Sequence, residues 1–173
     1  KALLRPEYMK ESDESAACMA AAEDRGVKVI IITLQTDIQL GSTKLVIYPA
    51  DKVYENDASN NSSLVTEVFH GNNSLLFTGD IEKERIADIK YELNDGGYDF
   101  LKVPHHGRYE KILPEFFSLV GAQSAVITSS EKNPEDQETV QALVDAGTMN
   151  YMLTRNGEIT LQSDGRKLDF TQK

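Results

Sequence analysis

The stretch that decides the fold starts with Leu75-Leu76-Phe77-Thr78-Gly79-Asp80 and ends with Leu101-Lys102-Val103-Pro104-His105-His106-Gly107. Each segment is an apolar run that ends in a possible metal ligand, either the Asp80 carboxylate or an imidazole of the His105-His106 pair. The two ends lie 105 − 80 = 25 positions apart, a spacing that fits a strand, a crossover helix and a neighbouring parallel strand. We therefore expect Asp80 and the histidine pair at the same edge of a sheet.

Periodicity, caps and turn residues divide the rest of the chain into alternating helices and strands. Helices are predicted over residues 12–25, 81–94, from about 114, and over 134–146. Strands are predicted over residues 27–33, 37–48 (a hairpin), 63–69 and 74–78 (a second hairpin), 98–103, 123–128, 149–153, 158–162 and 167–170. This order predicts an α/β fold, with mixed sheets and helices outside them, in one domain over residues 1–173.

Composition limits the function classes. The 173 residues are 40% hydrophobic and 27% charged, which is ordinary for a soluble globular domain. A net charge of −10 disfavours a nucleic-acid partner, although bound metal ions would offset some of that charge. No apolar run approaches the length of a transmembrane segment, the longest stretch of Val, Ile and Leu being 29–32, and the single Cys18 excludes an internal disulfide. The chain starts at Lys1 rather than Met, so the sequence leaves its compartment open.

Each candidate ligand also has a structural interpretation. Asp80 follows a glycine and precedes a helical pattern, so it is a good candidate for a helix N-cap. Adjacent residues on an extended segment point to opposite sides, so at most one of His105 and His106 is expected to reach a shared metal. His70 lies at a polar hairpin turn, where an exposed surface histidine is expected.

Together with Asn60-Asn61-Ser62-Ser63-Leu64-Val65, the two segments form an ordered triple. This triple resembles the metallo-β-lactamase-fold hydrolases of the competence DNA-uptake (ComEC-like) branch, and it is similar to bacterial phosphorylcholine esterases. The resemblance covers nearly the whole chain. It implies an αββα sandwich with two divalent metals at one sheet edge, usually zinc, with iron or manganese as alternatives. In such a site, hydroxide generated at the metals attacks a phosphoester or similar ester.

The resemblance also implies roles for individual residues. Asp80 matches the carboxylate that bridges the two metals, and one histidine of the pair matches a terminal ligand. We favour His105 as that ligand, because it comes first at the strand end, which leaves His106 either as a proton donor or as a group that supports the ligands. Arg108 replaces a serine that is common in the family, and it either holds an anionic substrate group or is a solvated loop arginine. Residues 130–135 lack the family's histidine and are expected to cap a helix.

One family motif is missing. The principal ligands of these hydrolases come from an early His-x-His-x-Asp-His segment, yet residues 1–69 contain no histidine. We therefore expect the chain to be the C-terminal portion of a longer hydrolase domain. That parent would be the enzyme, and this portion would be inactive alone because it lacks the N-terminal half of the domain. The alternative is a non-catalytic binding or scaffold module with a degenerate metal site.

Overall fold

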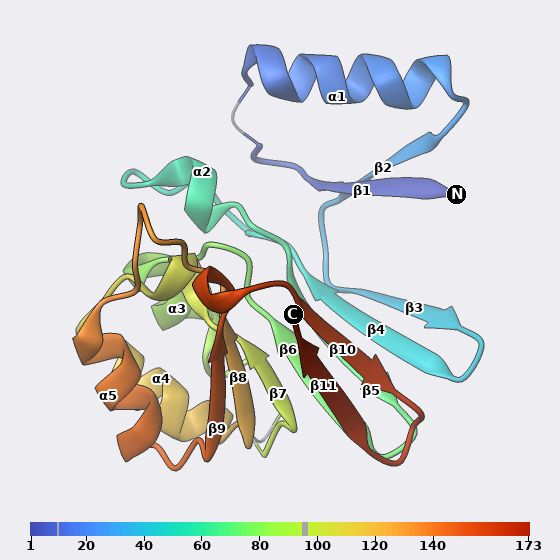
Figure 1. Cartoon of the computed structure of the whole chain (residues 1–173). Coiled ribbons are helices and arrows are strands. Elements are labelled where there is room, and N and C mark those ends of the chain that lie inside the picture. Colours follow the sequence, from blue (N-terminus) through green and yellow to red (C-terminus); the bar gives the residue numbers. More distant parts are fainter. Residues whose placement is uncertain (10, 95–96) are drawn as a thin grey trace.

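The computed structural model describes residues 1–9, 11–94 and 97–173, and its main body is a seven-stranded mixed sheet (Figure 1). The strand order is β3-β4-β5-β6-β7-β8-β9. The strands are β3 (Thr36–Leu40), β4 (Thr43–Tyr48), β5 (Val65–His70), β6 (Asn73–Phe77), β7 (Phe100–Lys102), β8 (Ser124–Ile127) and β9 (Asn150–Leu153). Pairing is antiparallel from β3 to β6 and parallel from β6 to β9.

The two faces of this sheet are covered differently. Helices α3 (Lys83–Ile89), α4 (Leu113–Val120) and α5 (Gln137–Asp145) pack on one face. The hairpin of β10 (Ile159–Ser163) and β11 (Leu168–Gln172) lies on the other face (Figure 1). Successive strand residues point to opposite faces, so Leu76 joins the helical core while Leu75 packs toward the hairpin. The α/β class with mixed sheets and outer helices is confirmed.

The N-terminal part is a small βαβ unit of β1 (Ala2–Pro6), α1 (Asp13–Asp24) and β2 (Lys28–Ile32). β1 and β2 form a separate parallel pair, and α1 lies along it (Figure 1). The Ser12 hydroxyl caps α1 by accepting from the Ser15 amide at 3.2 Å, as its position before the acidic first turn predicts. The helix predicted over residues 12–25 is therefore confirmed.

Several predicted boundaries need correction. The helix predicted over 81–94 is regular only over α3, because the next residues close into turns, with the Glu92 amide donating to the Ile89 carbonyl. No helix was predicted between residues 48 and 63, but this segment contains the short helix α2 (Ala58–Asn61). Two 3₁₀ turns, η1 (Pro104–Gly107) and η2 (Thr154–Asn156), follow β7 and β9. Within 1–9, 11–94 and 97–173, no helix has the length and apolar character needed to cross a membrane.

A buried carboxylate crosslinks the centre of the helical core. Glu67 is 2% exposed and accepts hydrogen bonds from the phenols of Tyr48 and Tyr98 and, at 3.0 Å, from the Asn94 amide. Burial and the bond to Glu67 raise the pKa of both phenols above the usual range, so they remain neutral donors. This network joins β4 and β5 to the segment before β7, which helps to fix the register of the strands that carry the site.

Candidate metal centre

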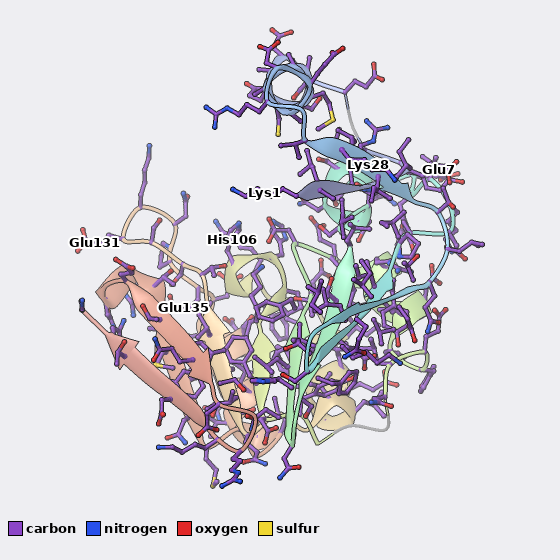
Figure 2. The ribbon with its side chains drawn as sticks, turned by 90° about the vertical axis from the view of Figure 1, so that its right-hand side faces the viewer. Lys1, Glu7, Lys28, His106, Glu131 and Glu135 are labelled. Carbon is purple, nitrogen blue, oxygen red and sulfur yellow. The ribbon has the colours of Figure 1, made fainter. Side chains whose placement is uncertain are left out.

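The carboxyl ends of parallel strands bring the predicted residues together. β6 pairs with β7 in parallel, and β7 pairs with β8, so the residues that follow these strands emerge at one sheet edge. Asp80 follows β6, the histidine pair follows β7, and Thr128 follows β8. Figure 2 shows His106 at this edge, on the side of the body that faces the N-terminal unit. The expectation that Asp80 and the histidines meet there is confirmed.

The Asp80 carboxylate lies between two basic side chains. Its Oδ2 is 3.3 Å from His106 Nε2, and its Oδ1 is 2.9 Å from Lys102 Nζ. Burial would raise the Asp80 pKa, but the hydrogen bond and charge of Lys102 outweigh it and lower the pKa overall. The N-cap of α3 is Glu82, so the interpretation of Asp80 as a helix cap is wrong. Its carboxylate is held at the site instead.

The backbone of the histidine pair has a conformation that is uncommon for non-glycine residues. His105 (φ 42°, ψ 50°) and His106 (φ 56°, ψ 19°) are both left-handed, and Gly107 follows at φ 79°. The premise that these histidines lie on an extended segment is therefore wrong. Non-glycine residues in the left-handed region are uncommon, and they concentrate at functional sites, where the surrounding structure compensates for the strain. Here the turn directs each imidazole to a different carboxylate.

His106 is oriented through its other ring nitrogen. Nδ1 lies 2.8 Å from the Thr128 carbonyl oxygen and 3.1 Å from the Thr128 hydroxyl. A carbonyl oxygen can only accept, so Nδ1 carries the hydrogen and a neutral ring presents its Nε2 lone pair to Asp80. A lone pair and a carboxylate oxygen at 3.3 Å repel each other unless a cation lies between them. That cation is either a proton on Nε2 or a metal ion.

His105 faces a different pair of side chains. Its Nδ1 lies 3.3 Å from Glu82 Oε1, and its Nε2 lies 3.4 Å from Asn60 Nδ2. Burial lowers the His105 pKa below its usual value, so the ring is held largely neutral. Burial likewise raises the Glu82 pKa. The predicted assignment of His105 as the metal ligand stays a prediction, and the contacts of Asp80 favour His106.

A pocket of about 290 Å³ opens beside the histidines, lined by His105, His106, Arg108, Thr128, Ser130 and Asn133. The Arg108 side chain is half exposed and only loosely paired, with Nη1 3.6 Å from Asp136 Oδ1. Residues 130–135 were predicted to cap a helix, but the N-cap of α5 is Asp136. Ser130 and Asn133 instead close a turn on each other and line this pocket, so the capping role is wrong.

The residues present fit part of a metal site. Carboxylate and imidazole suit zinc, and two ligands bound to one tetrahedral ion at about 2.1 Å each lie about 3.4 Å apart. The separation of 3.3 Å between Asp80 and His106 matches that value. Within the described residues, however, no three His, Cys, Asp or Glu side chains gather as a complete ligand set. Asp80 and His106 can therefore supply two ligands, and the others have to come from elsewhere.

Four residues of the site were missed from the sequence. Lys102 and Thr128 contact Asp80 and His106, while Glu82 and Asn60 contact His105. Of these four residues, Lys102 is the one that the sequence could have marked as part of a site, because it is a charged residue inside an otherwise apolar strand run. His70, expected at the surface, is half-buried, and its Nδ1 lies 2.9 Å from the Ser163 hydroxyl of β10.

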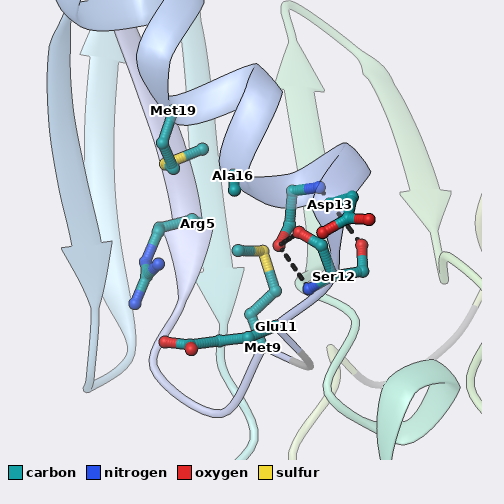
Figure 3. A pocket seen from close by; sticks show the side chains of 8 residues that line it. Arg5, Met9, Glu11, Ser12, Asp13, Ala16 and Met19 are labelled. Carbon is teal, nitrogen blue, oxygen red and sulfur yellow. Dashed lines mark hydrogen bonds between the residues drawn. The ribbon is translucent and has the colours of Figure 1, made fainter.

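A second pocket, of about 400 Å³, lies between β1 and the start of α1 (Figure 3). Arg5 and Met9 line it, together with the first residues of the helix. Ser12 already caps that helix end, and the nearby carboxylates of Glu11 and Asp13 oppose the binding of an anion. The pocket therefore lacks the features of a phosphate site.

Comparisons with known proteins concern the fold and part of the sequence. No family model matches the chain. ComE operon protein 3 of Bacillus subtilis is 26% identical over 133 residues, which cover 77% of this chain and 17% of that relative's length. Igni18, a metallo hydrolase from Ignicoccus hospitalis, superposes with a TM-score of 0.54 at 13% identity, covering 98% of this chain and 79% of its own.

A further solved structure is the metallo-beta-lactamase fold protein YhfI from Bacillus subtilis. It matches with a TM-score of 0.44 at 9% identity over 73% of this chain and 53% of its own. The chain thus shares its fold with the metallo hydrolase Igni18, and its sequence is similar to part of a ComE operon protein.

Proposed function

We propose that this chain is part of a metal-dependent hydrolase that cleaves a phosphoester or a similar ester. One observation supports this most directly: Asp80 Oδ2 and His106 Nε2 face each other at 3.3 Å with no hydrogen available from a neutral His106. A divalent cation between them would satisfy both groups. Such an ion polarises an ester and makes water a nucleophile near neutral pH. We assign this ligand role to His106, in place of the His105 predicted from the sequence.

A second divalent ion, as the family resemblance implies, would bind the other oxygen of Asp80. In this structure Lys102 Nζ lies 2.9 Å from that oxygen and also donates to the Gly79 carbonyl. For that ion to bind, Lys102 would have to leave Asp80 and keep only its hydrogen bond to the Gly79 carbonyl. We propose that the remaining ligands come from a His-x-His-x-Asp-His segment in a longer natural polypeptide that contains this chain, called the parent polypeptide below.

Metal removal tests this proposal. We expect the parent polypeptide to hydrolyse bis(4-nitrophenyl) phosphate, to lose that activity on dialysis against a chelator, and to regain it with Zn²⁺ or Mn²⁺. Metal analysis should give about two divalent ions per chain. The competing proposal, a non-catalytic scaffold module, is favoured by the incomplete ligand set among the described residues. A metal-replete parent polypeptide that holds no ion and cleaves no ester would establish the scaffold.

We further propose that Arg108 binds the anionic group of the substrate. Its guanidinium lines the histidine pocket, and within residues 1–9, 11–94 and 97–173 its only ion-pair partner is Asp136 at 3.6 Å, so its donors are available to a ligand. Ser130 and Asn133 add polar groups to the same wall. This lining suits a phosphate ester better than a neutral ester.

Substitution of Arg108 should therefore affect binding more than turnover. We expect Arg108→Ala in the parent polypeptide to raise KM for a phosphodiester roughly 10–100-fold while kcat changes little, since one charge-assisted hydrogen bond contributes about 1.5–3 kcal/mol. Steady-state kinetics measure both constants. Arg25→Ala, at the exposed end of α1, is the control and should change neither. An unchanged KM in Arg108→Ala would show that Arg108 is a solvated loop residue.

A further inference from the structure

We propose that Arg155, acting through Glu135, is a positioning residue that holds the histidine turn in the conformation needed for ester hydrolysis. The inference rests on the proposed function and deepens it, by adding residues behind the histidine pocket. The turn contains His105, His106 and Gly107, three consecutive residues with positive φ. Such a backbone persists only where the surrounding structure fixes it, so the contacts behind the turn have to supply that restraint.

Glu135 is packed directly behind this turn (Figure 2). A Cβ on Gly107 would lie 2.9 Å from Glu135 Cβ, so the two residues are as close as a glycine allows. The adjacent Asp136 amide donates to the Gly107 carbonyl at 3.0 Å, and Asp136 Oδ2 accepts from the Tyr109 amide at 2.8 Å. Residues 135 and 136 therefore hold the last residue of the turn and the segment that follows it.

Arg155 in turn fixes the position of Glu135. The Glu135 side chain is 1% exposed, and its Oε1 lies 3.0 Å from Arg155 Nη2. Its Oε2 is buried and has no hydrogen-bond partner within residues 1–9, 11–94 and 97–173. A buried ion pair with an unsatisfied oxygen adds little to stability, because the cost of desolvation offsets the attraction between the charges. Its place behind a strained turn therefore points to a role in fixing position.

The element that carries Arg155 also supports the His106 ring. Arg155 lies in η2, which follows β9. The neighbouring Thr154 hydroxyl donates to the Ser129 carbonyl at 2.6 Å. Ser129 follows Thr128, whose carbonyl oxygen lies 2.8 Å from His106 Nδ1. Two adjacent side chains of η2 thus contact both of the segments that position the histidine turn.

Amide hydrogen exchange of the 173-residue chain, followed by nuclear magnetic resonance, tests the positioning role without any activity. Arg155→Ala alone would leave a buried charge unpaired, so the informative variant combines Glu135→Met with Arg155→Ala and removes both charges. We expect the Asp136 and Tyr109 amides, which close the turn, to exchange at least about tenfold faster in this double variant. The Gly121 amide of the α4 end, which donates to the Phe117 carbonyl, is the internal reference and should be unchanged.

Kinetics of the parent polypeptide test the consequence for hydrolysis. The double variant should lower kcat for bis(4-nitrophenyl) phosphate roughly 10–100-fold while KM changes less than about threefold, because a small displacement of reacting groups affects turnover more than binding. The matched control is Arg166→Ala, in the exposed turn between β10 and β11. It should change neither the exchange rates nor the turnover.

The double variant separates a positioning role from a purely stabilising one. If it kept wild-type exchange at Asp136 and Tyr109, or wild-type kcat, the pair of Glu135 and Arg155 would serve stability alone and the inference would be overturned. If the wild-type parent polypeptide cleaves no ester, the proposed function fails, while the exchange rates still decide whether Arg155 positions the turn.

Discussion

Asp80→Asn in the parent polypeptide is expected to reduce ester hydrolysis by on the order of 10³-fold or more. Asparagine preserves the shape of the side chain but removes the charge that faces His106 Nε2 at 3.3 Å, so a cation bound there would lose an anionic ligand. The substitution also leaves the Lys102 ammonium beside a neutral amide. Initial rates with bis(4-nitrophenyl) phosphate measure the loss of hydrolysis, and metal analysis of the same sample measures the loss of bound ion.

Asp88→Asn is the matched control for this experiment. Asp88 also follows β6 closely in sequence and pairs with a lysine, with Oδ2 2.6 Å from Lys52 Nζ. It lies outside the histidine pocket, so its substitution should leave metal content and turnover nearly unchanged. If Asp80→Asn kept most of its activity and its metal, Asp80 could not be a ligand, and the metal-dependent mechanism proposed for this edge of the sheet would be wrong.

Gly107→Ala is expected to destabilise the fold by about 2–5 kcal/mol and to displace the histidine turn. Gly107 has a φ of 79°, and a Cβ there would lie 2.7 Å from Ile127 Cγ2 and 2.9 Å from Glu135 Cβ. Both contacts are in the packed region behind the turn, where Ile127 and Glu135 are buried. Urea unfolding followed by circular dichroism gives the change in the free energy of unfolding.

Gly41→Ala separates the two causes of the destabilisation expected at Gly107, which are backbone strain and steric overlap of the added Cβ. Gly41 has a similar φ of 61°, but a Cβ there would meet no atom within 4 Å. Its substitution should therefore cost only the backbone strain, about 1–2 kcal/mol. Comparable losses at the two positions would show that the space behind the histidine turn can relax, and the tight packing argued for Gly107 would be contradicted.

The sequence predicted the framework of the site well. Apolar runs, turn residues and the spacing from Asp80 to His105 depend on local periodicity and on the geometry of a parallel crossover, so the strands and their common edge followed from them. The capping serine of α1 was equally readable. The apolar runs, turns and cap are each encoded within a few neighbouring residues, where propensity and hydrogen bonding are strongest, and the 25-residue spacing follows from the length of a parallel crossover.

The side-chain partners could not be predicted in the same way. Lys102, Thr128, Glu82 and Asn60 reach the site from four different segments, and each pairing depends on how the sheet and helices pack. The left-handed backbone of the histidine pair also means that the alternation of an extended strand, which the sequence suggested, does not apply here. Tertiary packing thus decides which histidine meets which carboxylate, and no local pattern contains that information.

The sheet changes from antiparallel to parallel pairing at β6, and the strands of the two halves are joined by connections of very different length. Gly41 and Ser42 alone connect β3 to β4, whereas all of residues 78–99 lie between β6 and β7. Closing the longer connection costs more chain entropy, so the antiparallel half can form early and offer β6 as a template. β7 and β8 would then dock onto it and bring the histidine turn to Asp80. The site proposed at this edge would thus depend on the part of the sheet that has the longer chain connections.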